Sequence, residues 1–351
     1  MLGYTNLEEE LRLALANAVE VRPADSLLLS GGLDSSILAV LAKNSILFTT
    51  TLAGFGTDSE GAEHVANFLQ RKWHHKIVET DEVLEEGIPE VVRILNSFDP
   101  GILNDLPVYF SMENIRRQGL KTVMTGDGAD GLFAGYSYMW RIDDLNRYIR
   151  DRIIPTMDFS SGYISSALGL GLSQPYIDNR VVELALQIPG EMKVRSVIRG
   201  VSGDEYLNVM GTQDRFRDGG GELWGKIILR EAFEGYLPDE VLWRPKSDLM
   251  IGSGMYNIQE EIGRRISDAE LAGRRARYDI NWWDPVVPVS ENYLHGFRKL
   301  QTYLYETFLK VDGHLPEPMD NEKACDYCFA GLPVKSPHCK YCGGSIKVVQ
   351  Y

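Results

Sequence analysis

A run of glycine, serine and aspartate at residues 29–36, here called the first glycine loop, is the part of this chain best suited to chemistry. It consists of Leu29, Ser30, Gly31, Gly32, Leu33, Asp34, Ser35 and Ser36. The leucines before it are typical of the end of a buried strand, and the apolar run after it predicts a helix. Glycines permit a tight turn close to a ligand, and a helix N-terminus attracts anions. Because Asp34 would repel a bare phosphate, we expect Mg²⁺ between the carboxylate and a phosphate.

The first glycine loop differs from the two common glycine-rich phosphate loops. No lysine follows its glycines, as the P-loop of kinases and GTPases requires, and it is not a Gly-x-Gly-x-x-Gly dinucleotide turn. It resembles the PP-loop of ATP pyrophosphatases, which split ATP into AMP and pyrophosphate while adenylating a substrate. The alternative interpretation is an ordinary turn between a strand and a helix.

Residues 125–136, the second glycine loop, also follow a predicted strand and contain Gly126, Asp127 and Asp130. Ligands of open parallel sheets bind beyond the carboxyl ends of the strands, so we expect the two loops to face each other. Asp34 and Asp130 would then share a Mg²⁺ bound to the pyrophosphate part of ATP, and Asp127 would face the substrate. The alternative is a pair of helix-capping acids.

Two later lysines are candidates for the positive charge that adenylation requires. Lys226 opens a predicted helix, and Lys246 lies in a segment with proline before it and Gly-Ser-Gly after it. A cation near the α-phosphate and the departing pyrophosphate lowers the barrier to adenylation. The competing interpretation is a pair of ordinary surface lysines.

All four cysteines form two Cys-x-x-Cys pairs, at Cys325 and Cys328 and at Cys339 and Cys342. In a cytosolic chain this spacing indicates a structural Zn²⁺ rather than two disulfides, with redox or iron–sulfur use as the alternative. Four thiolates leave no open coordination position, so catalysis at this metal is not expected. The zinc ribbon would either staple a short tail or dock a partner or substrate.

The composition is that of a globular protein, with 44% apolar and 25% charged residues and a net charge of −14. The acidic balance disfavours nucleic acid as a partner. The chain has neither an apolar run of membrane-spanning length nor a signal-peptide pattern, so we expect a cytoplasmic location and no membrane partner.

The periodicity predicts an α/β fold with a parallel sheet and crossover helices, followed from about residue 140 by a mainly helical portion. We expect two domains, a PP-loop domain over residues 1–318 and a zinc ribbon over residues 319–351. The clearest predicted helices are 6–20, 58–72, 81–96, 107–118, 226–234 and 291–309, and the clearest predicted strands are 45–52, 76–79 and 120–125.

Several motifs, in order, resemble the synthetase domain of the asparagine synthetase B and β-lactam synthetase family, from about residue 20 to 260. The second glycine loop is similar to the family's Ser-Gly-Glu-Gly-x-Asp-Glu-Leu-Phe-x-Gly-Tyr, and residues 174–178 to Arg-x-Pro-Phe-Leu-Asp. The stretches 226–230 and 244–246 are similar to two late basic motifs.

This resemblance implies an adenine nucleotide alpha hydrolase-like fold and activation of a carboxylate as acyl-AMP by ATP and Mg²⁺. Ammonia or an amine would then attack the acyl-AMP to form an amide. The resemblance also implies that Lys246 contacts the activated intermediate and that Asp127 handles the proton of the nucleophile. Asp34 and Asp130 match the metal-binding acids.

The chain also departs from this family. Asparagine synthetase B has a glutaminase cysteine just after the initiator Met, whereas the first cysteine here is Cys325. We therefore expect no glutaminase domain and leave the nitrogen source open between free ammonia, an amine and ammonia from a partner glutaminase. Residues 99–107 lack an arginine that asparagine synthetases carry, which leaves the carboxylate open. A homodimer also stays open, and the zinc ribbon is not standard in the family.

An ATP-dependent, amide-forming ligase of asparagine synthetase type is the main hypothesis. The first alternative is a PP-loop enzyme that adenylates tRNA to modify its bases, because some PP-loop enzymes that thiolate tRNA carry Cys-x-x-Cys zinc modules. Such thiolation generally needs cysteines at the active site. The absence of cysteines outside residues 325–342 and the acidic charge oppose it. The second alternative is a non-catalytic nucleotide-binding or scaffold protein, which the joint presence of Asp34, Asp130 and Lys246 opposes.

Overall fold

The computed structural model describes residues 4–197, 217–218, 221–285, 290–334, 336 and 338–345. The chain divides into two compact units. The first consists of Met1–Thr50, Thr57–Lys76 and Ser111–Asp248, and the second of Thr51–Gly56, Ile77–Phe110 and Leu249–Tyr351. The four cysteines belong to the second unit, and a domain boundary at residue 318 stays a prediction.

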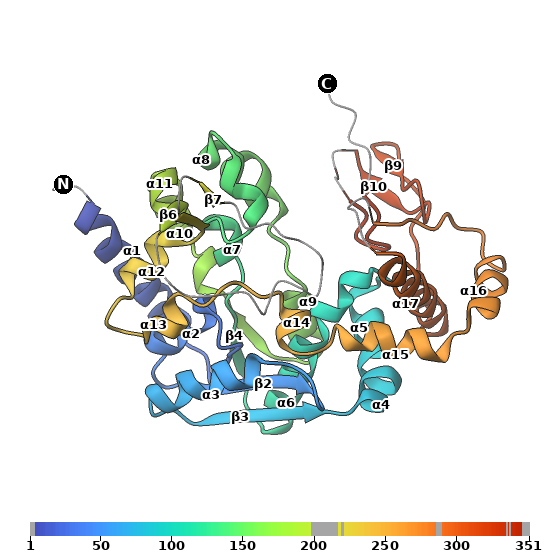
Figure 1. Ribbon diagram of the computed structural model, residues 1–351, viewed down its shortest axis with the longest axis horizontal. Helices are drawn as coiled ribbons and strands as arrows, with labels where there is room; N and C mark the ends of the chain where they lie inside the picture. Colours follow the sequence, from blue (N-terminus) through green and yellow to red (C-terminus); the bar gives the residue numbers. More distant parts are fainter. Residues whose placement is uncertain are drawn as a thin grey trace. The chain divides into compact units, whose positions relative to one another are not determined.

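A five-stranded sheet organises the first unit (Figure 1). Its order is β3-β2-β1-β4-β5, and β1 pairs in parallel with both β2 and β4, as β4 does with β5. The strands are β1 (Ser26–Leu28), β2 (Ile46–Leu52), β3 (Trp73–Val78), β4 (Thr122–Met124) and β5 (Gly171–Ser173). The chain builds outward from β1 to β3 and then returns to the other side of β1, so the strand order reverses between β1 and β4. Open α/β sheets bind ligands at such a reversal, and each glycine loop follows one of these two strands.

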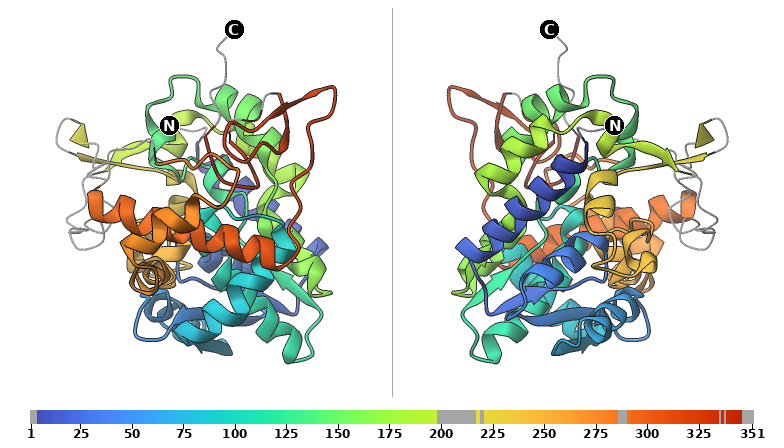
Figure 2. Two further views of the ribbon diagram at one scale, coloured as in Figure 1. Left: turned by 90° about the vertical axis from the view of Figure 1, so that its right-hand side faces the viewer. Right: turned by 90° about the vertical axis from the view of Figure 1, so that its left-hand side faces the viewer.

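The central strands β1, β2 and β4 are mostly buried on both faces. Six of the seven residues of β2 are buried, as expected for a parallel strand packed on both sides. The remaining elements of this unit are α1 (Tyr4–Val21), α2 (Leu33–Leu41), α3 (Asp58–Phe68), α6 (Leu106–Arg117, shared with the second unit), α7 (Ala129–Leu132), α8 (Leu145–Tyr148), α9 (Ser160–Ala167), α10 (Asn179–Gln187), α11 (Gly190–Lys193), α12 (Ile227–Ala232), α13 (Asp239–Leu242), β6 (Arg195–Val197), β7 (Arg217–Asp218) and β8 (Gly221–Trp224). α1 packs along α10 and α12 (Figures 1 and 2).

The second unit is built around the 20-residue helix α17 (Glu291–Lys310), against which α5 (Ile88–Leu95), α15 (Asn257–Arg265) and α16 (Asp268–Arg275) pack (Figure 2). It also contains α4 (Thr80–Glu82), α14 (Leu249–Gly252) and the antiparallel pair β9 (Glu322–Ala324) and β10 (Gly331–Pro333). The cysteine segment is anchored to this unit, since Phe98 N–H donates to the carbonyl of Tyr341 at 2.7 Å. Trp283 Nε1 donates to the carbonyl of Cys342 at 2.8 Å.

The α/β class and the long predicted elements are confirmed. The helix expected over 291–309 is α17, and the strand expected over 45–52 is β2. The helix expected over 81–96 is interrupted by a π-helical turn at Val83–Gly87. The short strands β5 to β10 were not expected, because two to four residues carry too little periodicity to stand out. Among the described residues, no helix is both long and apolar enough to cross a membrane.

Lys193, the last residue of α11, is fully buried in the first unit. Its Nζ donates to Asn146 Oδ1 at 2.5 Å, and no acidic side chain in the described ranges forms an ion pair with it. Burial lowers the pKa of Lys193 to about 7, because the interior disfavours the charged form.

The buried lysine predicts a pH dependence of stability. An unfolded lysine titrates near pH 10, so between pH 7 and pH 10 the unfolded chain holds a proton that the folded chain lacks. This group therefore makes the free energy of unfolding rise with pH across that window, by at most about 1.4 kcal/mol per pH unit. Urea denaturation of Lys193→Met should show a flatter slope than the wild type, whereas the exposed Lys121→Met should not. Equal slopes in wild type and Lys193→Met would contradict this assignment.

Candidate active site

Hydrogen bonds of serine hydroxyls hold the first glycine loop against the start of α2. Ser36 Oγ donates to the carbonyl of Gly32 at 2.7 Å, and Gly32 N–H donates to Ser30 Oγ at 3.3 Å. Gly31 has φ +70°, and a Cβ there would overlap the backbone of Gly61. Only glycine fits this position. The loop therefore has a fixed shape at the N-terminus of the nine-residue helix α2, where the helix dipole favours anions.

The second glycine loop meets the first at Gly126. A Cβ on Gly126 would lie 3.3 Å from Asp34 Cβ and 3.6 Å from Ser35 N. The Tyr176 hydroxyl donates to the carbonyl of Asp34 at 3.0 Å and so ties the same turn to the segment after β5. The expectation that the two loops face each other holds in this geometry.

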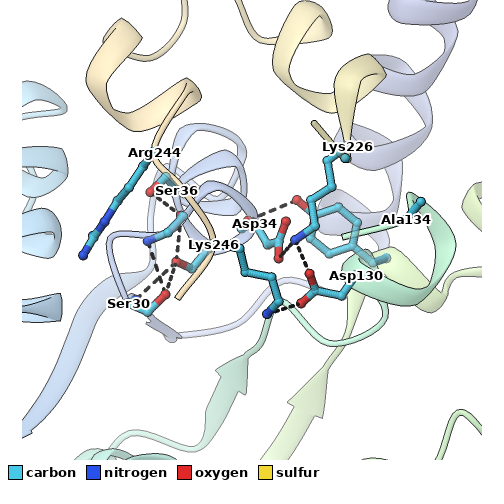
Figure 3. Close-up of polar contacts among 12 residues, drawn as sticks. Ser30, Asp34, Ser36, Asp130, Ala134, Lys226, Arg244 and Lys246 are labelled. Atoms are coloured by element: carbon cyan, nitrogen blue, oxygen red, sulfur yellow. Dashed lines mark hydrogen bonds and ion pairs between the residues drawn. The ribbon is translucent and has the colours of Figure 1, made fainter. Parts of the chain in front are cut away.

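Four charged side chains form one cluster between the loops, here called the charge cluster (Figure 3). Lys226 Nζ lies 2.6 Å from Asp34 Oδ2 and 2.7 Å from Asp130 Oδ1, so one ammonium group contacts both carboxylates. Lys246 Nζ lies 3.2 Å from Asp130 Oδ2. The four formal charges cancel within the cluster. The sequence predicted a role for each of these four residues, and the fold brings them together from segments that lie far apart in the chain.

Burial and charge shift the pKa values of Asp130, Lys246 and Asp34 in different ways. Burial raises the pKa of Asp130, but the ammonium groups of Lys226 and Lys246 outweigh it and lower that pKa to about 2. Burial opposes the charge of Lys246 as well, and the carboxylate of Asp130 outweighs it, so the pKa of Lys246 is raised. Burial raises the pKa of Asp34, which contacts one ammonium group rather than two.

Lys226 adopts a backbone conformation that is unusual for a residue with a side chain. Its φ is 58° and its ψ 28°, in the left-handed region, at the N-cap of α12. Its N–H donates to the carbonyl of Phe133 at 3.0 Å, and a Cβ on Gly135 would overlap Lys226 Cε. Such conformations cost roughly 1–3 kcal/mol and occur where the surroundings impose them, often at functional sites.

The charge cluster has a donor set suited to Mg²⁺. Asp34 Oδ1 is buried and has no hydrogen-bond partner among the described residues. An orphaned carboxylate oxygen in a polar site indicates a missing ligand, and carboxylate oxygens are preferred ligands of Mg²⁺. Asp34 and Asp130 therefore fit the metal site expected from the sequence.

Asp127 lies outside the charge cluster, in a nest of neutral donors. Its Oδ2 accepts hydrogen bonds from Thr125 Oγ1 at 2.5 Å, Ser161 Oγ at 2.5 Å and Gln174 Nε2 at 3.0 Å. These donors come from three segments, the end of β4, α9 and the turn after β5. The carboxylate is thereby held in one orientation by uncharged groups.

Sequence reasoning assigned no role to Tyr136 or Arg244, which also border the site. Lys246 Nζ lies 5.3 Å from the ring centroid of Tyr136, within cation–π distance. Arg244 Nη1 donates to the carbonyl of Gly31 at 3.1 Å. Arg244 stands two residues before Lys246 in a motif that was recognised only for its lysine. Gln174 begins the motif at residues 174–178, to which no role was assigned, and Ser161 carries no local sequence signal.

The cysteine cluster, formed by Cys325, Cys328, Cys339 and Cys342, has the geometry of a tetrahedral thiolate site. All four sulfur atoms are buried and lie within 4.8 Å of one another. The Sγ atoms of Cys325 and Cys342 are 3.7 Å apart, and those of Cys328 and Cys339 are 3.6 Å apart. Metal–sulfur bonds of about 2.3 Å in a tetrahedron place sulfurs roughly 3.8 Å apart, whereas a disulfide places them at about 2.05 Å.

Backbone amides support the same interpretation of the cysteine cluster. Tyr327 N–H donates to Cys325 Sγ and Tyr341 N–H donates to Cys339 Sγ, each at 3.4 Å. Each Cys-x-x-Cys turn therefore directs one amide at its first sulfur, which favours the thiolate form that metal binding requires.

Comparison with known sequences shows the family to which this chain is related. The sequence model of the Asparagine synthase family matches residues 6–162 and 151–280. A putative glutamine-hydrolysing asparagine synthetase of Methanocaldococcus jannaschii is 29% identical over 289 residues, which are 74% of this chain and 53% of that protein. Asparagine synthetase B of Escherichia coli is 26% identical over 306 residues, 78% of this chain and 50% of that protein. The chain thus spans about half the length of these curated relatives.

One solved structure that matches this chain has low sequence identity to it. The NMN synthetase of Francisella tularensis aligns over 91% of this chain at 12% identity with a TM-score of 0.33. The family assignment therefore rests on the sequence match, which covers most of the first unit and part of the second. The two glycine loops and both lysines of the charge cluster lie inside the matched residues. This chain belongs to the Asparagine synthase family.

Proposed function

We propose that this protein is an ATP-dependent ligase that activates a carboxylate as acyl-AMP and converts it to an amide. The observation that carries the proposal is the charge cluster, because it joins two phosphate-type loops at the strand reversal of an open sheet. Membership of the Asparagine synthase family supports the same reaction class. The carboxylate and the nitrogen donor are left unassigned within that class.

The proposed reaction has two steps. A carboxylate oxygen of the substrate attacks the α-phosphorus of ATP, the bond between the α- and β-phosphates breaks, and pyrophosphate leaves. Ammonia or an amine then attacks the acyl carbon, AMP departs with the bonding electron pair, and the nitrogen loses a proton. Both steps build negative charge on phosphate oxygens, which fixed cations stabilise.

The residues of the two loops have distinct proposed roles. The first glycine loop and Gly126 bind the phosphates of ATP through the start of α2; the loop residues in contact are Leu29, Ser30, Gly31, Gly32, Asp34, Ser35 and Ser36. Lys226 and Lys246 stabilise the charge that develops on the α-phosphate and on pyrophosphate. Asp127, oriented by its three neutral donors, accepts the proton of the nitrogen nucleophile.

Asp34 and Asp130 are the proposed ligands of Mg²⁺. The bound ion would neutralise phosphate charge and orient the pyrophosphate leaving group. Asp34 Oδ1 is the atom free to reach it, since Oδ2 already accepts from Lys226.

We further propose that the cysteine cluster holds a structural Zn²⁺. Four buried thiolates complete its coordination, so the ion would stabilise the fold of the second unit rather than take part in the reaction. The same clustering opposes the tRNA-thiolating alternative, because every cysteine of the chain is used in it. A cytoplasmic location, a partner glutaminase and a homodimer remain predictions from the sequence.

The first prediction of the proposed function concerns the products that the enzyme forms from ATP. In a screen of carboxylates that includes aspartate, with ammonium or glutamine as nitrogen donor, the matching acid should cause release of pyrophosphate and AMP. The reason is that the proposed attack is at the α-phosphorus. Release of ADP and phosphate alone would contradict the mechanism.

The second prediction concerns the metal ligands. Asp34→Ala should lower Mg²⁺-dependent pyrophosphate release by roughly 100-fold or more, since it removes a ligand and unpairs Lys226. Asp34→Asn keeps the shape and should lose comparable activity, which separates charge from packing. The exposed Asp143→Ala serves as the control and should match the wild type. Turnover by Asp34→Ala at the wild-type rate would remove the assigned role.

The third prediction concerns the cysteine cluster. Elemental analysis of the purified protein should give about one zinc per chain. The double variant Cys339→Ser/Cys342→Ser should lose it and unfold more readily, because half of the ligands are gone. Asp326→Ser lies between two ligands and is exposed, so it should keep the metal. A zinc-free wild-type protein isolated without chelators would defeat this assignment.

A further inference from the structure

The guanidinium of Arg244 fits beside helix α3 because Gly61 has no side chain. A Cβ on Gly61 would overlap Arg244 Nη1, and a Cβ on Gly31 would overlap the backbone of Gly61. Gly61 lies inside helix α3, where glycine costs about 1 kcal/mol relative to alanine. The presence of glycine at this unfavourable position indicates that the Arg244 guanidinium requires the space that a side chain would fill.

The guanidinium of Arg244 joins the segments that follow two neighbouring strands. Nη1 donates to the carbonyl of Gly31, in the first glycine loop after β1, at 3.1 Å. Nη2 lies 3.7 Å from Oδ1 of Asp58, in the first turn of α3 after β2. Asp58 is itself buried, and burial raises its pKa to about 7 although Arg244 opposes the shift. Figure 3 shows the side chain extending beside the first glycine loop, away from the charge cluster.

A second arginine fixes the backbone that carries Arg244. Arg230 Nε donates to the carbonyl of Gly225 at 3.0 Å, and its Nη1 donates to the carbonyl of Leu242. The guanidinium of Arg230 lies over two indole rings, 4.9 Å from the centroid of Trp224 and 5.5 Å from that of Trp243. Arg230 therefore holds the backbone just before the Arg244-Pro-Lys246 segment in place.

Lys246 lies only two residues beyond this anchor. Its ammonium group reaches Asp130 at 3.2 Å, on the opposite side of the first glycine loop from the guanidinium of Arg244 (Figure 3). Because residue 245 is proline, the short connection between the two side chains has a restricted backbone. The position of Lys246 is thereby tied to the position of the first glycine loop.

We propose that Arg244 is a positioning residue that locks the nucleotide-binding loop to α3 and sets Lys246 against it. This inference rests on the proposed function, because it assumes that the first glycine loop binds ATP. Arg244 itself does not touch the reacting atoms. Loss of the Arg244 side chain would remove the hydrogen bond to the carbonyl of Gly31 and the ion pair with Asp58. ATP binding would then weaken, while recognition of the carboxylate substrate would stay unchanged.

Gly61→Ala tests this without removing any charge, because the added methyl group occupies the slot of the guanidinium. The full chain is titrated by calorimetry with Mg²⁺ and α,β-methylene-ATP, whose α–β link cannot be split. We expect Gly61→Ala and Arg244→Ala each to bind the nucleotide about tenfold more weakly than wild type. Gly273→Ala is the matched control, since it lies in helix α16 with open space around its added Cβ.

The double variant makes the test specific for Arg244. If Gly61→Ala acts by displacing the guanidinium, it should add nothing to Arg244→Ala, so the double variant should bind the nucleotide as Arg244→Ala does. In the pyrophosphate assay, the single variants should raise the KM for ATP and leave the KM for the carboxylate unchanged. A general structural defect would raise both.

The outcomes separate this inference from the function on which it rests. A wild-type chain that binds no nucleotide would overturn the proposed function together with the role of Arg244. A wild-type chain that binds, with Gly61→Ala binding equally well, would overturn the role of Arg244 alone. So would a Gly61→Ala effect that persists undiminished in the Arg244→Ala background.

Discussion

One ammonium group holds this site together. Lys226 Nζ contacts carboxylates from both glycine loops, at 2.6 and 2.7 Å. Two carboxylates in a water-poor site repel each other and lose hydration, and a cation between them opposes both effects. Removing one member of such a partly buried set leaves its partner's charge uncompensated, which is destabilising. Lys246 adds a second cation to the same cluster through its contact with Asp130.

The second constraint is space. The loops, α3 and the late basic segments approach one another so closely that a Cβ would not fit at Gly31, Gly61 or Gly135. The absence of a side chain at Gly61 leaves room for the guanidinium of Arg244, and its absence at Gly135 leaves room for the aliphatic part of Lys226. Glycine here does more than permit a turn. It lets charged groups from distant segments reach backbone and carboxylate oxygens directly, in a site where a single methyl group would separate them.

The chemistry of the two units is separate. The charge cluster lies in the first unit, and the cysteine cluster lies in the second, held by backbone bonds to the segment at Phe98. Four sulfur ligands would leave a bound Zn²⁺ no free coordination position, so the role we propose for this ion is structural. The proposed reaction therefore depends on the strand reversal between β1 and β4, whereas the proposed Zn²⁺ would stabilise the second unit.

The sequence by itself determined the chemistry-bearing residue types, the strand that precedes each glycine loop and the four members of the cysteine cluster. These are local properties, because a tight turn, a helix start and a Cys-x-x-Cys turn are set by neighbouring residues. It did not reveal that Lys226 bridges Asp34 and Asp130, or that three neutral donors surround Asp127. Those contacts join segments that are distant along the chain, and sequence periodicity carries no record of them. Only the tertiary structure decided them, because charge balance and close approach are properties of the packed chain.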